Sequence, residues 1–380
     1  MTEVLASVVR ALLEAHWDDA RGFCVPNPTT YPHLWLWDSC FHAVIWARLD
    51  DPRAGAEFEA ALAGQLAGGL VPHMRYGAEP PDVWLGPLPH TSSLAQPPMF
   101  GHAARVLASR GQRPSSQALE RARRGLGWLW EHRRAPDGLL YVVHPWEAGN
   151  DHAPRFDDWG APCSQAARSA WNVARMGDVS FDVDGAAMWS SAFVVKPAAF
   201  NAYVAFNFLE LAHVLDDALL AERGRQLAAA ADTHLWNASE QLWSDEPVVG
   251  GGPSTRIPLS DGVMGALVTP DPARAHAALD QLTAPDRFGS AAGPANVARH
   301  HPAYDPGAYW RGAAWPHLSY LLHLALLRWD RQDDAARLAR RTRARALASG
   351  WAEYWNAETG QPLGAVPQSW TGLVLAMTDQ

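Results

Sequence analysis

The chain has 380 residues, of which 48% are hydrophobic and 19% charged, a composition typical of a globular protein with a large buried core. Its formal net charge of −9 argues against nucleic-acid and membrane binding and favours a small neutral or acidic substrate. The scattered cysteines Cys24, Cys40 and Cys163 have neither disulfide-framework nor zinc-ligand spacing, so we expect a reducing, cytoplasmic setting and no metal.

Apolar residues recur at three- and four-residue spacing along most of the chain, beginning with an N-terminal segment that has the pattern of an ordinary helix. This spacing predicts helices over 2–16, 39–49, 52–68, 97–110, 115–133, 198–214, 216–236, 271–283, 308–328, 331–349 and 369–378. Long connections rich in Gly, Pro and Trp lie at 22–37, 70–96, 136–162, 244–259 and 284–307. Strand-like pieces such as 139–146 are isolated, so we expect only small hairpins.

These elements favour an all-α fold with a single domain spanning residues 1–380. Paired helices with alternately long and short connections fit an (α/α)6 barrel, a closed toroid whose long loops form one central pocket. An open helical solenoid is the structural alternative, but no residue pattern repeats at a fixed period. The segment 160–196 is where a lid over the pocket would fall, and no apolar stretch approaches the roughly 20 residues of a membrane-spanning helix.

Tryptophan is unusually frequent, with 19 residues. Those within predicted helices, Trp46, Trp128, Trp130 and Trp171, are interpreted as core residues. Many others stand beside polar residues in the long loops, where a flat apolar face and hydrogen-bonding groups together suit a sugar ring. The loop tryptophans therefore indicate a carbohydrate site.

The stretch 144–159 contains four acids, two histidines, one arginine and two tryptophans between Gly and Pro breaks. Such a loop suits the rim of a pocket, although an acid-rich loop can equally be a solvated face. A carboxyl group that donates a proton at neutral pH needs a partly dry site, which aromatic neighbours provide. Asp151 is our candidate for this general acid.

A second acid follows the predicted helix that ends near Gly350. A glycosidase needs two carboxyl groups across the scissile bond, one to protonate the leaving oxygen and one to activate water or attack carbon. Glu353 is flanked by aromatic residues and is the stronger candidate, whereas Glu358, before Thr-Gly, reads as a turn residue and is the runner-up.

Two further motifs stand where helices are expected to begin. In Tyr-Trp-Arg-Gly-Ala-Ala-Trp-Pro (309–316), Pro316 fits the first turn of a helix. In Trp-Asp-Ser-Cys-Phe-His (37–42), Asp38 is either an N-cap or a sugar-binding residue, and the sequence leaves both interpretations open. The 16 histidines show no HExxH or similar ligand pattern, which again predicts no metal site.

At these residues the sequence resembles glycoside hydrolase family 63, especially its bacterial glucosylglycerate and mannosylglycerate hydrolase branch, and more distantly the trehalases of family 37. The resemblance rests on several motifs in the same order along the chain, at 35–43, 71–74, 96–98, 144–157, 309–312 and 353–360. It implies an inverting reaction at an α-linked sugar, with Asp151 as general acid and Glu353 as general base. Inversion needs room for water, so these carboxyl groups should lie roughly 6.5–9.5 Å apart.

The resemblance also implies a set of residues that hold the sugar or shape the pocket. These are Tyr31, Trp35, Trp37, Asp38, Gln96, Trp146, Gly149, Trp310, Trp315 and Gln368, with Arg155 and Arg311 as arginines that orient carboxylates through paired hydrogen bonds. The chain departs from the family pattern at Ala148, where Ser is usual, and at Ala357, where Pro is common.

The leading hypothesis is therefore an enzyme that hydrolyses a small α-glycoside of the glucosylglycerate or mannosylglycerate type without a cofactor. A carboxylate on the aglycone would need Arg, Lys or several hydroxyl donors, and Arg75, Arg155 and Lys196 are available. The alternatives are an α-glucosidase acting on a disaccharide or short oligosaccharide, a non-catalytic sugar-binding protein, and an isomerase or epimerase. Glucose versus mannose preference and the existence of a homo-oligomer stay open.

Overall fold

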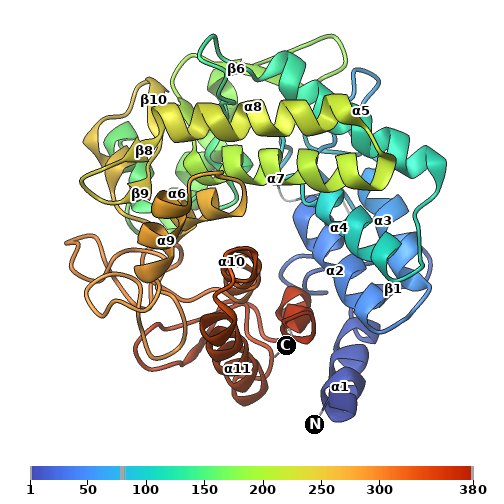
Figure 1. Ribbon diagram of the computed structural model, residues 1–380. Helices are drawn as coiled ribbons and strands as arrows, with labels where there is room; N and C mark the ends of the chain where they lie inside the picture. The colour runs from blue at the N-terminus through green and yellow to red at the C-terminus, as the bar shows by residue number, and fades with distance from the viewer. Residues whose placement is uncertain (1, 78–80, 82, 378–380) are drawn as a thin grey trace.

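The computed structural model describes residues 2–77, 81 and 83–377. Its α-helices are α1 (Thr2–Glu14), α2 (Leu36–Arg48), α3 (Arg53–Leu62), α4 (Phe100–Ser109), α5 (Ser116–His132), α6 (Gln165–Arg175), α7 (Ala198–Leu215), α8 (Ala218–His234), α9 (Pro272–Asp280), α10 (Pro316–Arg328) and α11 (Gln332–Ala348). The helices follow one another around a ring, and the two ends of the chain lie near each other (Figure 1). The C-terminal 3₁₀ segment η6 (Ser369–Leu375) contacts both α1 and α2, which joins the end of the ring to its start.

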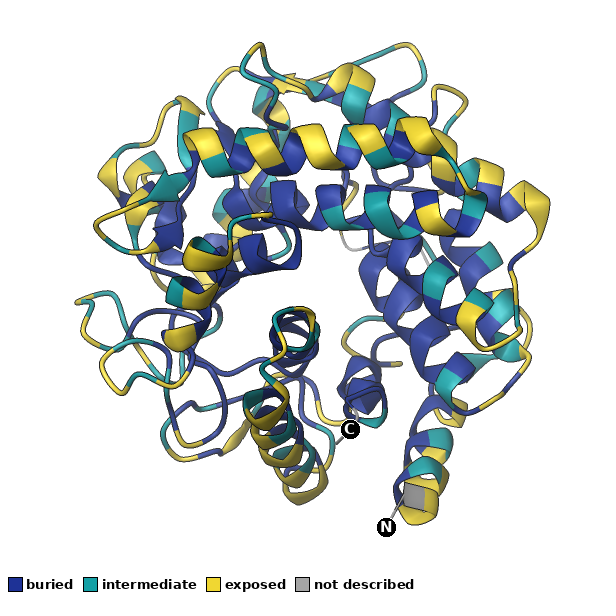
Figure 2. Ribbon diagram, viewed as in Figure 1, coloured by how far each residue is buried: buried dark blue, intermediate teal, exposed yellow. Residues whose placement is uncertain are grey.

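Successive helices pack in pairs that differ in burial. α7 packs on α8, α2 on α3 and α10 on α11. Helices α2, α7 and α10 are mostly buried, whereas α8, α5 and α11 bury one stripe and expose the opposite face (Figure 2). An inner helix that is apolar all round and an outer helix with one apolar stripe are the two patterns that a double layer of helices requires.

The strands are short and form separate two-stranded antiparallel sheets within the described part of the chain. The pairs are β1 (Trp17–Asp18) with β2 (Phe23–Cys24), β3 (Leu34–Trp35) with β4 (Met74–Arg75), β5 (Val179–Phe181) with β6 (Ala187–Ser190), β7 (Val194–Lys196) with β10 (Glu246–Val249), β8 (Trp236–Asn237) with β9 (Leu242–Trp243), and β11 (Tyr354–Trp355) with β12 (Pro362–Leu363). The remaining 3₁₀ segments are η1 (Pro145–Ala148), η2 (Pro154–Trp159), η3 (Met176–Asp178), η4 (Pro253–Arg256) and η5 (Ser260–Leu267). The prediction of a mainly helical fold with small hairpins is confirmed.

Several predicted boundaries are wrong for identifiable reasons. The helix expected from residue 308 begins at Pro316, because proline fits the first helical position and Trp310 has a positive φ of 57° that no helix interior accepts. The helix expected over 52–68 ends at Leu62. The helix α6, in the segment where we expected a lid, is not among our predicted helices, and η6 forms where an α-helix over 369–378 was expected. Residue 378 lies outside the described residues.

One described helix, α7, satisfies the length and hydropathy criteria for a membrane-spanning segment. Within its 18-residue window, 72% of the residues are buried inside the protein, as expected for a core helix. Its apolar character is explained by its place in the inner layer, where it contacts α4, α8 and η5.

Candidate active site

The long loops and the first turn of α2 surround a cavity with a volume of about 580 Å³. Most of the predicted site residues line it, namely Tyr31, Trp35, Trp37, Asp38, Gln96, Trp146, Gly149, Asp151, Trp310, Glu353 and Gln368. Trp315, Arg155 and Arg311 are not among its lining residues. Side chains from near both ends of the sequence thus meet at one cavity.

Glu353 stands just before strand β11 and is only 2% exposed. Its Oε1 accepts a hydrogen bond of 3.2 Å from the Tyr31 hydroxyl, and its Oε2 accepts one of 2.8 Å from the Ala365 backbone N–H. Burial raises the pKa of Glu353 to about 7, and the negative charge of Asp151 adds to this rise. A carboxylate poised near neutral pH is suited to accept a proton from water.

Asp151 follows the 3₁₀ segment η1 and is 8% exposed. Two N–H groups converge on its Oδ2, the indole Nε1 of Trp146 at 3.0 Å and the amide Nδ2 of Asn172, on α6, at 3.1 Å. Both donors engage Oδ2, so the second oxygen, Oδ1, receives neither of these hydrogen bonds. Helix α6 thus contacts the Asp151 carboxyl group through Asn172.

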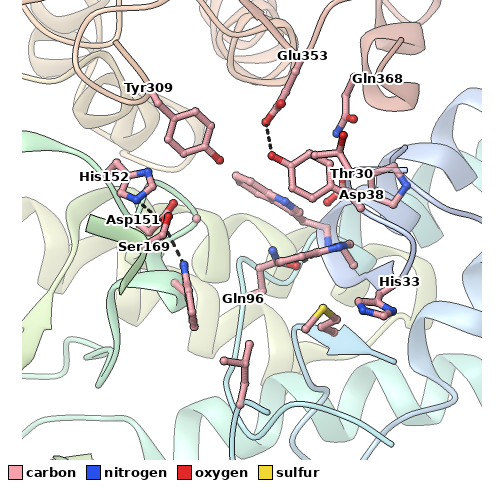
Figure 3. Close-up of a pocket in the computed structure, with 18 of the residues that line it drawn as sticks. Thr30, His33, Asp38, Gln96, Asp151, His152, Ser169, Tyr309, Glu353 and Gln368 are labelled. Atoms are coloured by element: carbon pink, nitrogen blue, oxygen red, sulfur yellow. Dashed lines mark hydrogen bonds and ion pairs between the residues drawn. The ribbon is translucent and has the colours of Figure 1, made fainter. Parts of the chain in front are cut away.

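The two carboxyl groups lie on opposite sides of the same cavity, with the Tyr309 ring directed between them (Figure 3). Burial raises the pKa of Tyr309 well above its usual value, and Tyr31, Glu353 and Asp151 all add to this rise. These mutual effects show that the groups share one electrostatic environment although about two hundred positions separate the two acids in the sequence. Such a pair can act on one bond from two sides.

The cavity wall at the start of α2 combines indole faces with buried polar atoms. The Trp37 backbone N–H donates to Gln96 Oε1 at 2.9 Å, which fixes the glutamine amide. One oxygen of Asp38, Oδ1, and the indole Nε1 of Trp35 are buried without a hydrogen-bond partner among the described residues. A sugar offers hydroxyl groups that satisfy such atoms and a C–H face that packs on indole.

The interpretation of Asp38 as an N-cap is wrong. Helix α2 begins at Leu36 with Trp35 as its N-cap residue, so Asp38 lies inside the first turn. Burial raises the pKa of Asp38 well above its ordinary value, and Glu353 raises it further. This rise favours the protonated form of Asp38, whose hydroxyl can donate a hydrogen bond.

Gly149 allows its loop to pack closely against Trp37. Its φ is +83°, and a Cβ at this position would lie 2.9 Å from two ring carbons of Trp37. Any side chain would therefore displace the Trp37 indole, in addition to the cost of the left-handed backbone. The glycine lets the loop that carries Asp151 approach α2 closely.

Trp315 does not line the cavity but packs against Trp310, which does. Its ring stacks on that of Trp310 at 3.8 Å with an angle of 9° between the planes, and on its other side it stacks on Tyr354 at 4.5 Å. The role predicted for Trp315 in shaping the pocket thus acts through Trp310. The His317 ring packs against the rings of Trp37 and Trp370, with centroids 4.8 and 4.2 Å apart. Burial lowers the pKa of His317 to about 3, so it is a neutral member of this aromatic cluster.

The predicted arginines bind carboxylates other than the two candidate catalytic groups. Arg155 binds Asp245 at 2.7 Å and also binds Asp261, and Arg311 binds Asp157 through two hydrogen bonds of 3.0 and 2.7 Å. These pairs connect the loops around the site.

The other charged candidates also have partners away from the cavity. Arg75 donates to the Ala60 carbonyl, and Lys196 pairs with Asp137 and Glu246. Glu358, the runner-up acid, binds Arg299 and Tyr304. None of the three candidates lines the described cavity, so the geometry favours Glu353 over Glu358.

Three potential metal ligands do meet elsewhere in the described part of the chain. The ligand atoms of Cys24, His42 and Glu57 lie within 4.8 Å of one another, and all three residues are buried. Hydrogen bonds within the protein already engage this cluster, because Glu57 accepts the Cys24 backbone N–H at 2.7 Å and His42 Nε2 lies 2.6 Å from the Ser369 hydroxyl. The cluster links β2, α2, α3 and η6.

Several residues of this site are not among the predicted site residues. Tyr309 and His152 are immediate neighbours of Trp310 and Asp151, so adjacency to a predicted residue was a usable signal. Asn172 reaches the site only through the packing of α6, which nothing in its local sequence indicates. Trp370, which follows the polar residues Gln368 and Ser369, is one of the tryptophans interpreted as sugar-binding, and it lines the cavity.

Two buried carboxyl groups on opposite sides of an indole-lined cavity are the arrangement that a glycoside hydrolase requires. The sequence model described as "Mannosylglycerate hydrolase MGH1-like glycoside hydrolase domain" matches residues 31–371, and the chain belongs to this family. The resemblance to glycoside hydrolase family 63 is confirmed.

Relatives and solved structures agree with this assignment. A mannosylglycerate hydrolase of Thermus thermophilus is 27% identical over 93% of this chain and 96% of its own. A glucosylglycerate hydrolase of Mycolicibacterium hassiacum is 27% identical over 95% of each chain. The fold matches the crystal structure of a family 63 mannosylglycerate hydrolase from Thermus thermophilus in complex with Tris and D-glycerate, with a TM-score of 0.81 and 24% identity over 98% of this chain and 99% of that one.

Proposed function

We propose that this enzyme hydrolyses a small α-glycoside of the glucosylglycerate or mannosylglycerate type, with inversion at the sugar carbon. The observation that carries the proposal is the buried carboxyl pair, Asp151 and Glu353, on opposite sides of one cavity. The substrate class is supported by the relatives named mannosylglycerate and glucosylglycerate hydrolase, which align along nearly their whole lengths.

In this mechanism Asp151 donates a proton to the oxygen that leaves with the aglycone. Glu353 removes a proton from a water molecule, which attacks the sugar carbon from the opposite face. The Tyr31 hydroxyl holds Glu353 Oε1, while the Ala365 N–H holds Oε2, so the base has a fixed orientation. Asp38 and Gln96 bind sugar hydroxyls, and the indoles of Trp35, Trp37 and Trp310 pack on the ring.

The arrangement of the helices around the cavity also supports this proposal. We propose that the paired helices form an (α/α)6 barrel in one domain, with the cavity at the centre of the toroid. The segment 160–196 then forms one wall of that cavity, because Gln165, Ser169 and Val173 of α6 line it.

A set of α-glycosides and three variants tests the assignment of roles. The parent enzyme should release sugar from glucosylglycerate or mannosylglycerate, and Asp151→Asn and Glu353→Gln should each lose about 10²–10⁴-fold in kcat. With α-glucosyl fluoride, whose leaving group needs no proton, Asp151→Asn should keep most of its activity and Glu353→Gln should not. Glu222→Gln, at an exposed position of α8, is the matched control.

The results separate the alternatives. Equal sugar release by the parent and both site variants would refute the assigned roles. Activity on maltose-type disaccharides but not on glycerate-linked sugars would favour an α-glucosidase, and tight sugar binding without hydrolysis would favour a binding protein.

A further inference from the structure

His152 is a buried histidine that the mechanism above does not use. Its side chain lines the cavity, the residue is 5% exposed, and neither ring nitrogen has a hydrogen-bond partner among the described residues. Its Nε2 lies 3.5 Å from Asp151 Oδ2, an ion-pair separation, and the ring meets the Tyr309 ring edge-on at 4.9 Å. Buried polar atoms are normally paired, and apart from the Asp151 contact the ring has no polar partner among the described residues, so Nδ1 is available to bind a substrate group.

The position of His152 indicates which part of the substrate it would contact. His152 and Ser169 lie beside Asp151, on the side of the cavity away from Glu353 (Figure 3). The acid of an inverting glycosidase stands next to the leaving oxygen, whereas the base and its water stand on the opposite face of the sugar. The aglycone therefore lies on the Asp151 side, against His152 and the Gln165 and Ser169 side chains of α6.

The electrostatic surroundings of His152 favour an anion. Arg168 of α6 binds Asp157 at 2.6 Å, and Arg311 binds the same carboxylate, so two guanidinium groups share one negative charge. Both arginines act on His152 electrostatically, which places this net positive cluster near the imidazole. No Lys or Arg is among the described side chains that line the cavity, and the other lining histidine, His33, lies on the far side from Asp151.

We propose that His152 is the specificity-determining residue for an acidic aglycone and that it binds the substrate's carboxylate in its protonated form. This inference rests on the proposed function. A protonated imidazole offers a full charge and N–H donors at both nitrogens, whereas the neutral ring has only one. The Arg168–Asp157–Arg311 cluster attracts the carboxylate to the same end of the cavity.

The charged groups around His152 determine when it takes up this proton. Burial lowers its pKa below the ordinary value, Asp151 raises it, and Arg168 and Arg311 lower it; the Tyr309 ring also contacts it. In the free enzyme the neutral form of His152 is therefore favoured, and an anion bound beside the ring would favour its protonation. Affinity for an acidic substrate should then decrease as pH rises, and affinity for a neutral substrate should not.

A pair of substrates that differ in one group tests this coupling in the unmodified enzyme. The KM for α-glucosylglycerate should rise between pH 6 and 8, by at most about tenfold per pH unit because one proton is involved. The KM for α-glucosylglycerol, which lacks the carboxylate, should stay level. Both substrates use Asp151 and Glu353, so the neutral one corrects for the titration of the catalytic pair.

A variant and a binding measurement complete the test. His152→Asn should raise the KM for α-glucosylglycerate at pH 6 by about tenfold or more and change kcat, and the KM for α-glucosylglycerol, by less than about threefold. His213→Asn, at an exposed position of α7 outside the cavity, should match the parent. Calorimetry with D-glycerate in two buffers of different ionisation enthalpy should show proton uptake by the parent and none by His152→Asn.

The possible outcomes are distinct. If the enzyme hydrolyses both substrates but the KM values respond equally to pH, or D-glycerate binds without proton uptake, the role of His152 is refuted while the proposed function stands. If the enzyme hydrolyses neither these glucosides nor the matching α-mannosides, both are refuted. The pH profile and the calorimetry of the parent decide the question even if His152→Asn does not fold.

Discussion

As the proposed base, Glu353 should determine how the activity falls at acid pH. Burial raises its pKa to about 7, and a base functions only when it is ionised. On a neutral-aglycone substrate, kcat/KM should therefore fall about tenfold per pH unit below pH 7. Rates measured from pH 4.5 to 8.5 check this, and an acid limb centred near pH 4.5 would show that Glu353 is not the base.

The same residue should destabilise the fold. The pKa of Glu353 is higher in the folded protein than its ordinary value of 4.5, so folding favours the protonated form. The stability that this protonated form contributes is fully present below pH 4.5 and is lost as pH rises through about 7. Glu353→Gln removes this buried charge and should stabilise the protein at pH 8.5 by about 3 kcal/mol, since the pKa is about 7 rather than 4.5 and a tenfold change in proton affinity equals about 1.4 kcal/mol. Denaturant unfolding at pH 8.5 and 4.5 measures the difference, which should be small at pH 4.5. A difference that did not depend on pH would contradict this account.

The β11–β12 hairpin positions Glu353 through Gly364, which follows β12. Gly364 has a φ of +72°, and a Cβ there would lie 2.3 Å from Glu353 Oε2. Gly22 has the same φ with open space around it, and so is a matched control. Gly22→Ala should lose about 1 kcal/mol of unfolding free energy with normal kcat, and Gly364→Ala should lose more and reduce kcat at least tenfold. Equal kcat values would show that Gly364 does not constrain the base.

Helix α6 acts on the general acid through Asn172. Asn172→Ala removes the 3.1 Å hydrogen bond to Asp151 Oδ2 and leaves only the Trp146 indole to hold that oxygen, so kcat should fall about tenfold with little change in KM. Ala167→Ser, at an exposed position of α6 outside the cavity, is the control. Steady-state kinetics measure both variants, and an unchanged kcat in Asn172→Ala would remove this positioning role.

Prediction from sequence succeeded for elements whose apolar spacing is strong and failed where tertiary packing decides the structure. The inner and outer helices were identified because burial on one or all sides leaves a periodic pattern. Helix α6 was not, because the structure fully buries only Arg168 and Asn172 of it, and polar residues show no apolar stripe. Asp151 and Glu353 were identified from their aromatic surroundings and the family resemblance, whereas the partners of Arg155 lie about 90 and 106 positions away and could not be predicted.

At the scale of the whole molecule, the ring brings the loop that carries Asp151 against the hairpin that carries Glu353. The C-terminal η6 packs on α1 and α2, and Trp370 of η6 lines the same cavity as Trp37 of α2. The ring thereby sets two acids on opposite sides of one cavity, and in the proposed mechanism this arrangement dictates the stereochemistry of the product.

The anomer that forms first tests this claim most directly. Hydrolysis of an α-glycoside followed by proton NMR from the first minute should show the β-anomer appearing first, with the α-anomer growing in later by mutarotation. Initial release of the α-anomer would mean that the second carboxyl attacks the sugar directly, and it would contradict the roles assigned to Asp151 and Glu353.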